Sequence, residues 1–144
     1  MTLRGAVPQA TNEYIGVYSG GDGTFMRSGG TKTVDSDLYI GDGGGSQGSY
    51  TLSGTGELTT TDEHVAKFGE GSFTQTGGEH TVTDDLRIGR YVGAVGTYTI
   101  SVGSLNAAQL HVGLEGSGTF EITNAAAEVT VTEYLRFGTY RNGM

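Results

Sequence analysis

The chain has 144 residues, enough for one domain with a buried core, and contains 27 Gly, 1 Pro, no Cys and no Trp. This composition, without a triplet period, excludes collagen-like and proline-rich chains, and 35% hydrophobic against 17% charged residues excludes a charge-solvated disordered chain. The net charge of −8 and the scattered basic residues disfavour nucleic-acid binding, and the lack of Cys excludes disulfides and thiolate metal sites.

Residues 1–11 come first in the chain, and we expect them to form an N-terminal cap or partial coil, with Leu3 and Val7 over the core. This segment has no hydrophobic signal core, so the sequence gives no indication of a signal peptide in this chain. No apolar run approaches the length of a membrane span, so we expect no membrane insertion.

From residue 12 onward, three sequence markers recur with one period. The first is a large apolar residue followed by a small one: Ile15-Gly16, Ile40-Gly41, Val65-Ala66, Ile88-Gly89, Val112-Gly113 and Phe137-Gly138. The second is Gly, then Thr or Ser, then an aromatic: Gly23-Thr24-Phe25, Gly48-Ser49-Tyr50, Gly71-Ser72-Phe73, Gly96-Thr97-Tyr98 and Gly118-Thr119-Phe120. The third is a single aliphatic residue: Val34, Leu58, Val82, Leu105 and Val129.

Each repeat contains three short segments of alternating pattern, which indicates strands, separated by Gly-, Asn- or Asp-rich corners. A repeat of 22–25 residues is too short for a propeller blade, which needs roughly 40. The sequence therefore predicts an all-β fold over residues 12–144. This single domain is a parallel β-solenoid (a right-handed β-helix, by the usual crossover chirality) of about five coils with three short strands per coil.

Several of these segments resemble the Gly/Thr-rich repeats of large exported bacterial proteins, of the autotransporter-like and planctomycete-type surface classes. They are EYIGVYSGGDGTFMRSGGTKTV, LYIGDGGGSQGSYTLSGTGEL and FGEGSFTQTGGEHTVTDDLRIG, and the resemblance covers roughly residues 12–140. It implies a β-helix passenger with an extracellular or cell-surface location, and it brings no defined catalytic residues.

The five aromatic residues of the second marker are expected to stack inside the solenoid as a ladder, a core feature rather than a cofactor platform. Two neighbouring inward columns are polar in coils one and three and apolar in coils two, four and five. They are Glu13, Leu38, Glu63, Leu86 and Leu110, and Arg27, Leu52, Gln75, Ile100 and Ile122. Because a buried charge needs a partner, we predict that Glu13 meets Arg27 and that Glu63 meets Gln75. The alternative is that these strands bend and turn the polar groups outward.

Three outward arrays could carry a function. The residues directly before the first marker are expected to form an exposed stripe: Tyr14, Tyr39, His64, Arg87, His111 and Arg136. Such a stripe could stack sugar rings or bind an acidic polymer, although exposed strand positions are more often simply solvated. A Thr/Ser array resembles ice-binding surfaces, but Met26 and Glu121 interrupt it: Thr24, Ser49, Ser72, Thr97 and Thr119, with Thr51, Thr74 and Thr99. Corner carboxylates offer a weak calcium site: Asp37, Asp62, Asp84 and Asp85.

Catalytic constellations are not recognisable, although Asp84, Asp85 and Arg87 could be compared with the carboxylate-and-base sites of polysaccharide lyases. We therefore expect no enzyme and no obligatory cofactor. The expected function is a structural or adhesive repeat module that associates end to end, because the ends of a solenoid expose unpaired strand edges. The alternative is a binding module for a glycan or another polymer, or less readily for ice.

Overall fold

The computed structural model describes residues 2–3 and 9–138, and within these ranges it contains strands and no helix. The strands are β1 (Thr2–Leu3), β2 (Glu13–Ile15), β3 (Asp22–Arg27), β4 (Thr31–Ile40), β5 (Gln47–Leu52), β6 (Glu57–Val65), β7 (Glu70–Ile88), β8 (Val95–Val112), β9 (Ser117–Ile122) and β10 (Ala127–Phe137). All of them belong to one sheet, in which every pairing is parallel. The predicted all-β parallel solenoid of about five coils is confirmed.

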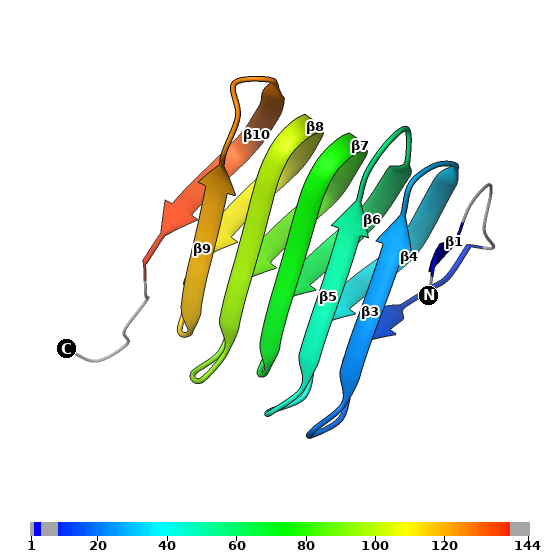
Figure 1. The fold of residues 1–144 in the computed structure, drawn as a ribbon. Helices are drawn as coiled ribbons and strands as arrows, with labels where there is room; N and C mark the ends of the chain where they lie inside the picture. Colours follow the sequence, from blue (N-terminus) through cyan, green and yellow to red (C-terminus); the bar gives the residue numbers. More distant parts are fainter. Residues whose placement is uncertain (1, 4–8, 139–144) are drawn as a thin grey trace.

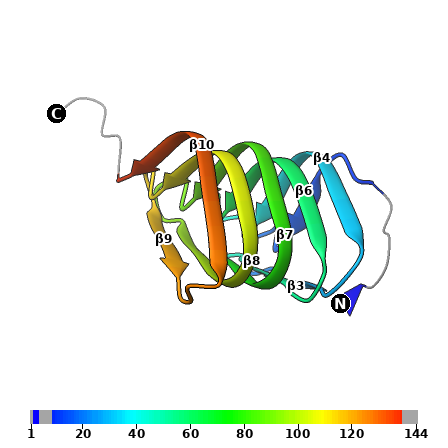
Figure 2. The same cartoon turned by 90° about the horizontal axis from the view of Figure 1, so that it is seen from above.

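The chain winds as a right-handed coil. In Figure 1 it rises along β3 and β5 on the near face, descends along β4 and β6 on the far face, and advances toward the C-terminal end. The view from above in Figure 2 shows the same sense, which agrees with the usual crossover chirality. We number the coils by residues 13–34, 38–60, 63–82, 86–107 and 110–131, and residues 134–137 continue beyond the fifth.

Each coil has three paired stretches, as the sequence predicts, but they are not three separate short strands. Between β7 and β8 the paired stretches are 70–75 with 95–100, 79–82 with 104–107, and 85–88 with 109–112, separated by register shifts. The chain bends at these irregularities while its backbone stays in the sheet, so β7 and β8 each run through a whole coil. Periodicity alone did not predict this, because the bend between the second and third stretches needs no glycine.

The aromatic ladder lies in the core as predicted. Ring centroids of successive members are 4.9, 4.9, 4.6 and 5.3 Å apart, close to the spacing of parallel strands. The members are Phe25, Tyr50, Phe73, Tyr98 and Phe120, of which the first four are buried and the last is partly buried. Stacking at this spacing fixes the height of each coil over the one before it.

Close contact between backbone segments explains the glycine that begins the second marker, two residues before each aromatic residue of the ladder. A Cβ atom at Gly48 would collide with backbone atoms of Gly41 and Ile15, at the corner where a third stretch is followed along the chain by a first stretch. All residues in the column of Gly41 have a positive φ, which glycine adopts at little cost. Ala66 is the one residue of this column that is not glycine, and its φ is also positive, at 66°. These corners are therefore conserved in shape from coil to coil.

The two ends of the solenoid differ. At the N-terminal end, β1 pairs with Met26 and Arg27, and Ala10 bridges to Val34, so the described part of the predicted cap lies on coil one. Val7 and the side chain of Leu3, which were expected to cover the core, lie outside the described residues. At the C-terminal end, β9 and β10 pair only with β8 among the described strands.

Candidate functional site

The predicted stripe forms a continuous row on the outside of the third stretch. The sheet register places Tyr14, Tyr39, His64, Arg87, His111 and Arg136 one above the other. Tyr14 stacks on Tyr39 with ring centroids 4.8 Å apart, and Tyr39 stacks on His64 at 4.9 Å.

The prediction that this stripe is exposed is wrong in its middle. Tyr14 is 48% exposed, but His64 is only 2% exposed and His111 only 7%. Charged side chains from the neighbouring rows lie over it: the Lys67 ammonium lies 4.8 Å from the centre of the Tyr39 ring. Strand alternation sets which way a side chain leaves the sheet, but not what the flanking side chains then cover.

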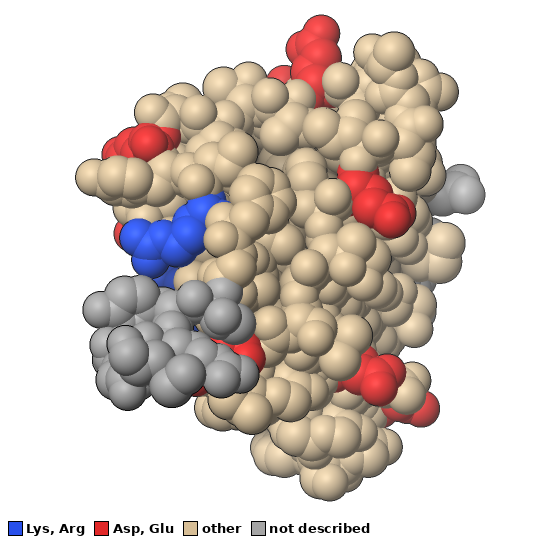
Figure 3. Space-filling model, turned by 90° about the vertical axis from the view of Figure 1, so that its left-hand side faces the viewer, with Lys and Arg blue, Asp and Glu red and all other residues tan. Residues whose placement is uncertain are grey.

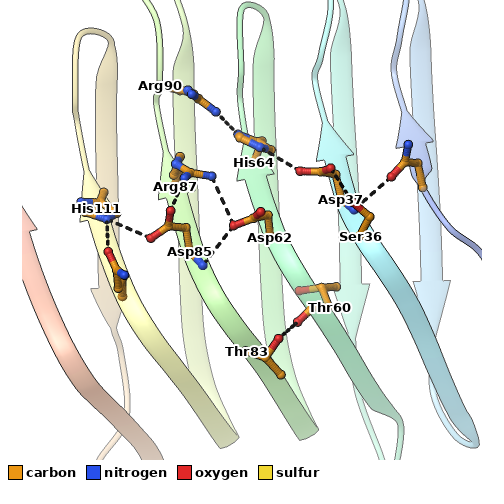
Figure 4. Close-up of polar contacts among 12 residues, drawn as sticks. Ser36, Asp37, Thr60, Asp62, His64, Thr83, Asp85, Arg87, Arg90 and His111 are labelled. Carbon is orange, nitrogen blue, oxygen red and sulfur yellow. Dashed lines mark hydrogen bonds and ion pairs between the residues drawn. The ribbon is translucent and has the colours of Figure 1, made fainter.

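His64 is held between two charged groups (Figure 4). Its Nε2 lies 3.4 Å from an Asp37 carboxylate oxygen, and Arg90 Nη1 lies 3.5 Å from its Nδ1. Burial, followed by the charges of Arg87 and Arg90, lowers the pKa of His64 to about 4. The imidazole is therefore neutral at pH 7 and acts as a packed polar group.

The predicted carboxylate group is partly assembled. Asp62, Asp84 and Asp85 have ligand oxygens within 4.8 Å of one another, whereas Asp37, one coil away from Asp62, pairs with His64 instead. Calcium prefers six or more oxygens, so these three residues would be an incomplete ligand set, and a calcium site stays a prediction.

Side chains of the protein itself already contact this carboxylate group (Figure 4). Arg87 forms ion pairs with Asp85 and with Asp62, the latter at 3.4 Å, and His111 Nε2 lies 3.2 Å from Asp85. Burial raises the pKa of Asp62 despite the nearby arginine. These contacts form a ladder that joins successive coils, so the carboxylates of Asp62 and Asp85 already have partners within the protein.

A second polar cluster lies inside the core. Glu63 Oε2 is 2.8 Å from Nε2 of His80, the other ring nitrogen of His80 is 2.8 Å from the Tyr98 hydroxyl, and that hydroxyl donates to Gln75 Oε1 at 2.7 Å. All four side chains are fully buried. The inward orientation of Glu63 and Gln75 is therefore confirmed.

The predicted direct contact between Glu63 and Gln75 is wrong, because His80 and Tyr98 stand between them. His80 was not predicted as a partner, although the sequence contains a signal for it. Lys32, Leu58, His80 and Leu105 form a third inward column that is polar in the same two coils.

Coil one carries the corresponding cluster. Glu13 forms an ion pair with Lys32, which the sequence analysis did not include, and the buried Arg27 donates to the carbonyl oxygen of Gly29 at 2.9 Å. The predicted pair of Glu13 and Arg27 stays a prediction.

The Thr/Ser array borders a shallow groove rather than a flat surface. The groove has a volume of about 420 Å³ and runs across coils one to four. Four hydroxyl residues border the groove: Thr24, Ser49, Ser72 and Thr97. Asp22, Gln47 and Glu70 are among its other lining residues. A mixed hydroxyl and carboxylate lining lacks the flat, regular surface expected for ice binding.

An apolar surface of a different kind covers the C-terminal end of the solenoid. A hollow of about 450 Å³ opens there between the stretches of the last coil, lined chiefly by Leu110, Phe120, Ile122, Val129, Val131 and Leu135. Ile122 is 55% exposed and Phe137 is 63% exposed. Figure 3 shows this end as a largely uncharged face with separate acidic groups around it and a basic patch on the left of the view.

This chain matches no protein-family model, and neither characterised proteins nor solved structures show significant similarity to it. Among the described residues there is no helix with the length and apolar character needed to cross a membrane.

Proposed function

We propose that this protein is a non-catalytic structural or adhesive module of an exported or cell-surface protein, and that it associates end to end through the C-terminal end of its solenoid. The observation that carries the proposal is the apolar end face. Inward positions that are fully buried in coils two to four are open in the last coil, as Ile100 at 0% and Ile122 at 55% exposure illustrate. Exposed apolar patches of this kind favour association.

The strand edges support the same proposal. The backbone groups of β9 and β10 that point away from β8 have no partner strand among the described residues, and such an edge is a template for another chain. The location rests on the resemblance to exported repeat proteins alone.

A binding module is the less favoured alternative. The stripe that would stack sugars engages its own neighbours through His64, Arg87 and His111, and two of these residues, His64 and His111, are buried. A catalytic role is also disfavoured, because the ionisable groups that come together, Asp62, Asp85 and Arg87, are engaged in ion pairs with one another.

Light scattering coupled to size-exclusion chromatography over a hundredfold range of concentration tests the proposal. We expect the mean mass of the wild-type chain to rise with concentration, and Ile122→Glu to abolish the rise. Val92→Glu is the matched control, because Val92 is 78% exposed but lies in a corner loop away from the end face. A wild-type chain that stays monomeric throughout, or equal effects of the two variants, would contradict end-to-end association.

A further inference from the structure

The buried columns of this solenoid alternate between polar and apolar coils. Three inward positions, one on each face, hold Glu13, Arg27 and Lys32 in coil one and Glu63, Gln75 and His80 in coil three. The same positions are aliphatic in coils two, four and five: Leu38, Leu52, Leu58; Leu86, Ile100, Leu105; Leu110, Ile122, Val129. The core therefore contains two polar layers, each followed by an apolar coil.

The aromatic ladder follows the same alternation. Polar coils one and three carry Phe, whereas the apolar coils that follow them carry Tyr50 and Tyr98. The Tyr98 hydroxyl reaches back into coil three, where it contacts both Gln75 and His80. The charge of Arg27 in coil one opposes the rise in the pKa of Tyr50 that burial causes. Tyr98 thus comes from one coil, and the polar layer that its hydroxyl contacts lies in the coil before it.

We infer that the stacking unit of this protein is a pair of coils, and that its polar layers determine which coil can lie next to which. Positions 25 and 73 are both Phe, 50 and 98 are both Tyr, and 38 and 86 are both Leu; each pair is 48 residues apart. The segments GTFMRSGGTKTVDSDLYIG and GSFTQTGGEHTVTDDLRIG, which begin at Gly23 and Gly71, are identical at 10 of 19 positions. The period of about 24 residues is thus half of the true one.

The selection follows from the cost of an unpaired buried polar group. A Phe coil stacked on coil three would leave His80 Nδ1 and Gln75 Oε1 without the tyrosine hydroxyl. A Tyr coil stacked on an apolar coil would bury a hydroxyl with no partner. Each such orphaned group is expected to change the unfolding equilibrium about tenfold or more.

Coil five departs from the period, because it carries Phe120 but has Leu110, Ile122 and Val129 where a polar layer would stand. Its outer face offers no partner to a tyrosine hydroxyl. A coil that stacks on coil five, whether it belongs to this chain or to a second copy, is therefore expected to have no tyrosine at the ladder position.

Insertion variants of the full chain test the two-coil unit. The matched variant carries a second copy of residues 63–109 after Gln109, which preserves the alternation of polar and apolar coils. The mismatched variant carries two extra copies of residues 86–109, a nearly equal length, and stacks two Tyr coils on apolar ones. A third variant replaces the tyrosine equivalent to Tyr98 by Phe in both extra copies.

Urea unfolding gives the comparison. We expect the mismatched variant to have an unfolding constant about a hundredfold larger than that of the matched variant, and the Tyr→Phe replacement to recover most of the difference. Equal stability of the matched and mismatched chains would overturn the inference, as would a lack of recovery by Phe.

Point variants of the natural chain decide the question if the insertions do not fold. Tyr98→Phe is expected to raise the unfolding constant about tenfold, and adding Glu63→Leu, Gln75→Ile and His80→Leu to it is expected to restore at least part of the loss. A quadruple variant less stable than Tyr98→Phe alone would show that the tyrosine and the polar layer do not depend on each other.

Discussion

Glu63 has no solvent exposure, and the imidazole of His80 is the group that allows its carboxylate to be buried. The Glu63 Oε1 atom has no partner among the described residues, so the whole interaction depends on Oε2. An aliphatic chain cannot replace the imidazole in this role, because it leaves a carboxylate in an apolar environment.

His80→Leu is therefore expected to lower the free energy of unfolding by about 3 kcal/mol, because it leaves the buried Glu63 carboxylate without a partner and removes one of the two hydrogen bonds of the Tyr98 hydroxyl. The double variant Glu63→Leu/His80→Leu is expected to lose less than His80→Leu alone, since no orphaned carboxylate remains. Urea unfolding of the wild type, both single variants and the double variant gives the coupling free energy. Additive effects of the two substitutions would contradict the pairing.

His64 gives the protein a pH dependence of known sign. Its folded-state pKa is about 4 against an ordinary value of 6.5, so between these pH values the unfolded chain binds a proton that the folded chain does not. Stability contributed by the neutral imidazole is present above pH 6.5 and is lost as the pH falls toward 4.

His64→Gln is expected to reduce the slope of unfolding free energy against pH by close to one proton between pH 6.5 and 4.5. Asp37, Lys67, Arg87 and Arg90 face His64 and stay unchanged in this variant. The measurement is urea unfolding at several pH values. An unchanged slope would mean that His64 titrates in the folded protein near its ordinary pKa.

The elements of this fold are defined by their corners as much as by their strands. The sequence predicts the corner between a third stretch and the first stretch that follows it along the chain, because glycine recurs there. The bend within β6 or β7 shows no such signal: the strand turns at a register shift after Thr60 or Val82 without a special residue. Boundaries of this kind depend on packing around the core, which a one-dimensional pattern does not contain.

Two glycine substitutions separate close backbone contact from simple flexibility. Gly48→Ala is expected to destabilise the protein by more than about 3 kcal/mol, because its Cβ would collide with the backbone of Gly41 and Ile15, which cannot move aside. Gly44→Ala is expected to change stability by less than about 0.5 kcal/mol, because no atom lies within 4 Å of the added Cβ. Thermal unfolding of the two variants, followed by circular dichroism, tests this contrast, and similar losses would refute it.

At the scale of the whole molecule, the first two sequence markers were enough to predict a parallel solenoid and its aromatic ladder. The third marker mixed two neighbouring columns, because Leu58 pairs with Lys32 and His80, whereas Val34 and Val82 pair with Thr60. They were not enough to predict how the polar residues are connected. Glu63 and Gln75 were correctly placed inside, but their partners His80 and Tyr98 come from other stretches, and only the coil geometry brings them together. The burial of His64 was missed for a similar reason, since long side chains from adjacent coils cover it.

The solenoid is a one-dimensional stack, so local stability is expected to depend on whether a coil has neighbours on both sides. β7 and β8 pair on both sides, whereas β9 and β10 pair on one side among the described strands. Amide hydrogen exchange at low protein concentration is therefore expected to be slowest in β7 and β8 and fastest, among the paired strands of coils two to five, in β9 and β10.

Concentration then separates an intrinsically weak last coil from one that a partner covers. If chains associate through the C-terminal end, amides of β9 and β10 gain protection as concentration rises, while those of β7 stay unchanged. Ile122→Glu should remove this gain without altering exchange in β7, because Ile122 belongs to the last coil. Protection in β9 and β10 that is independent of concentration would leave the gradient in place but exclude the end face as the site of association.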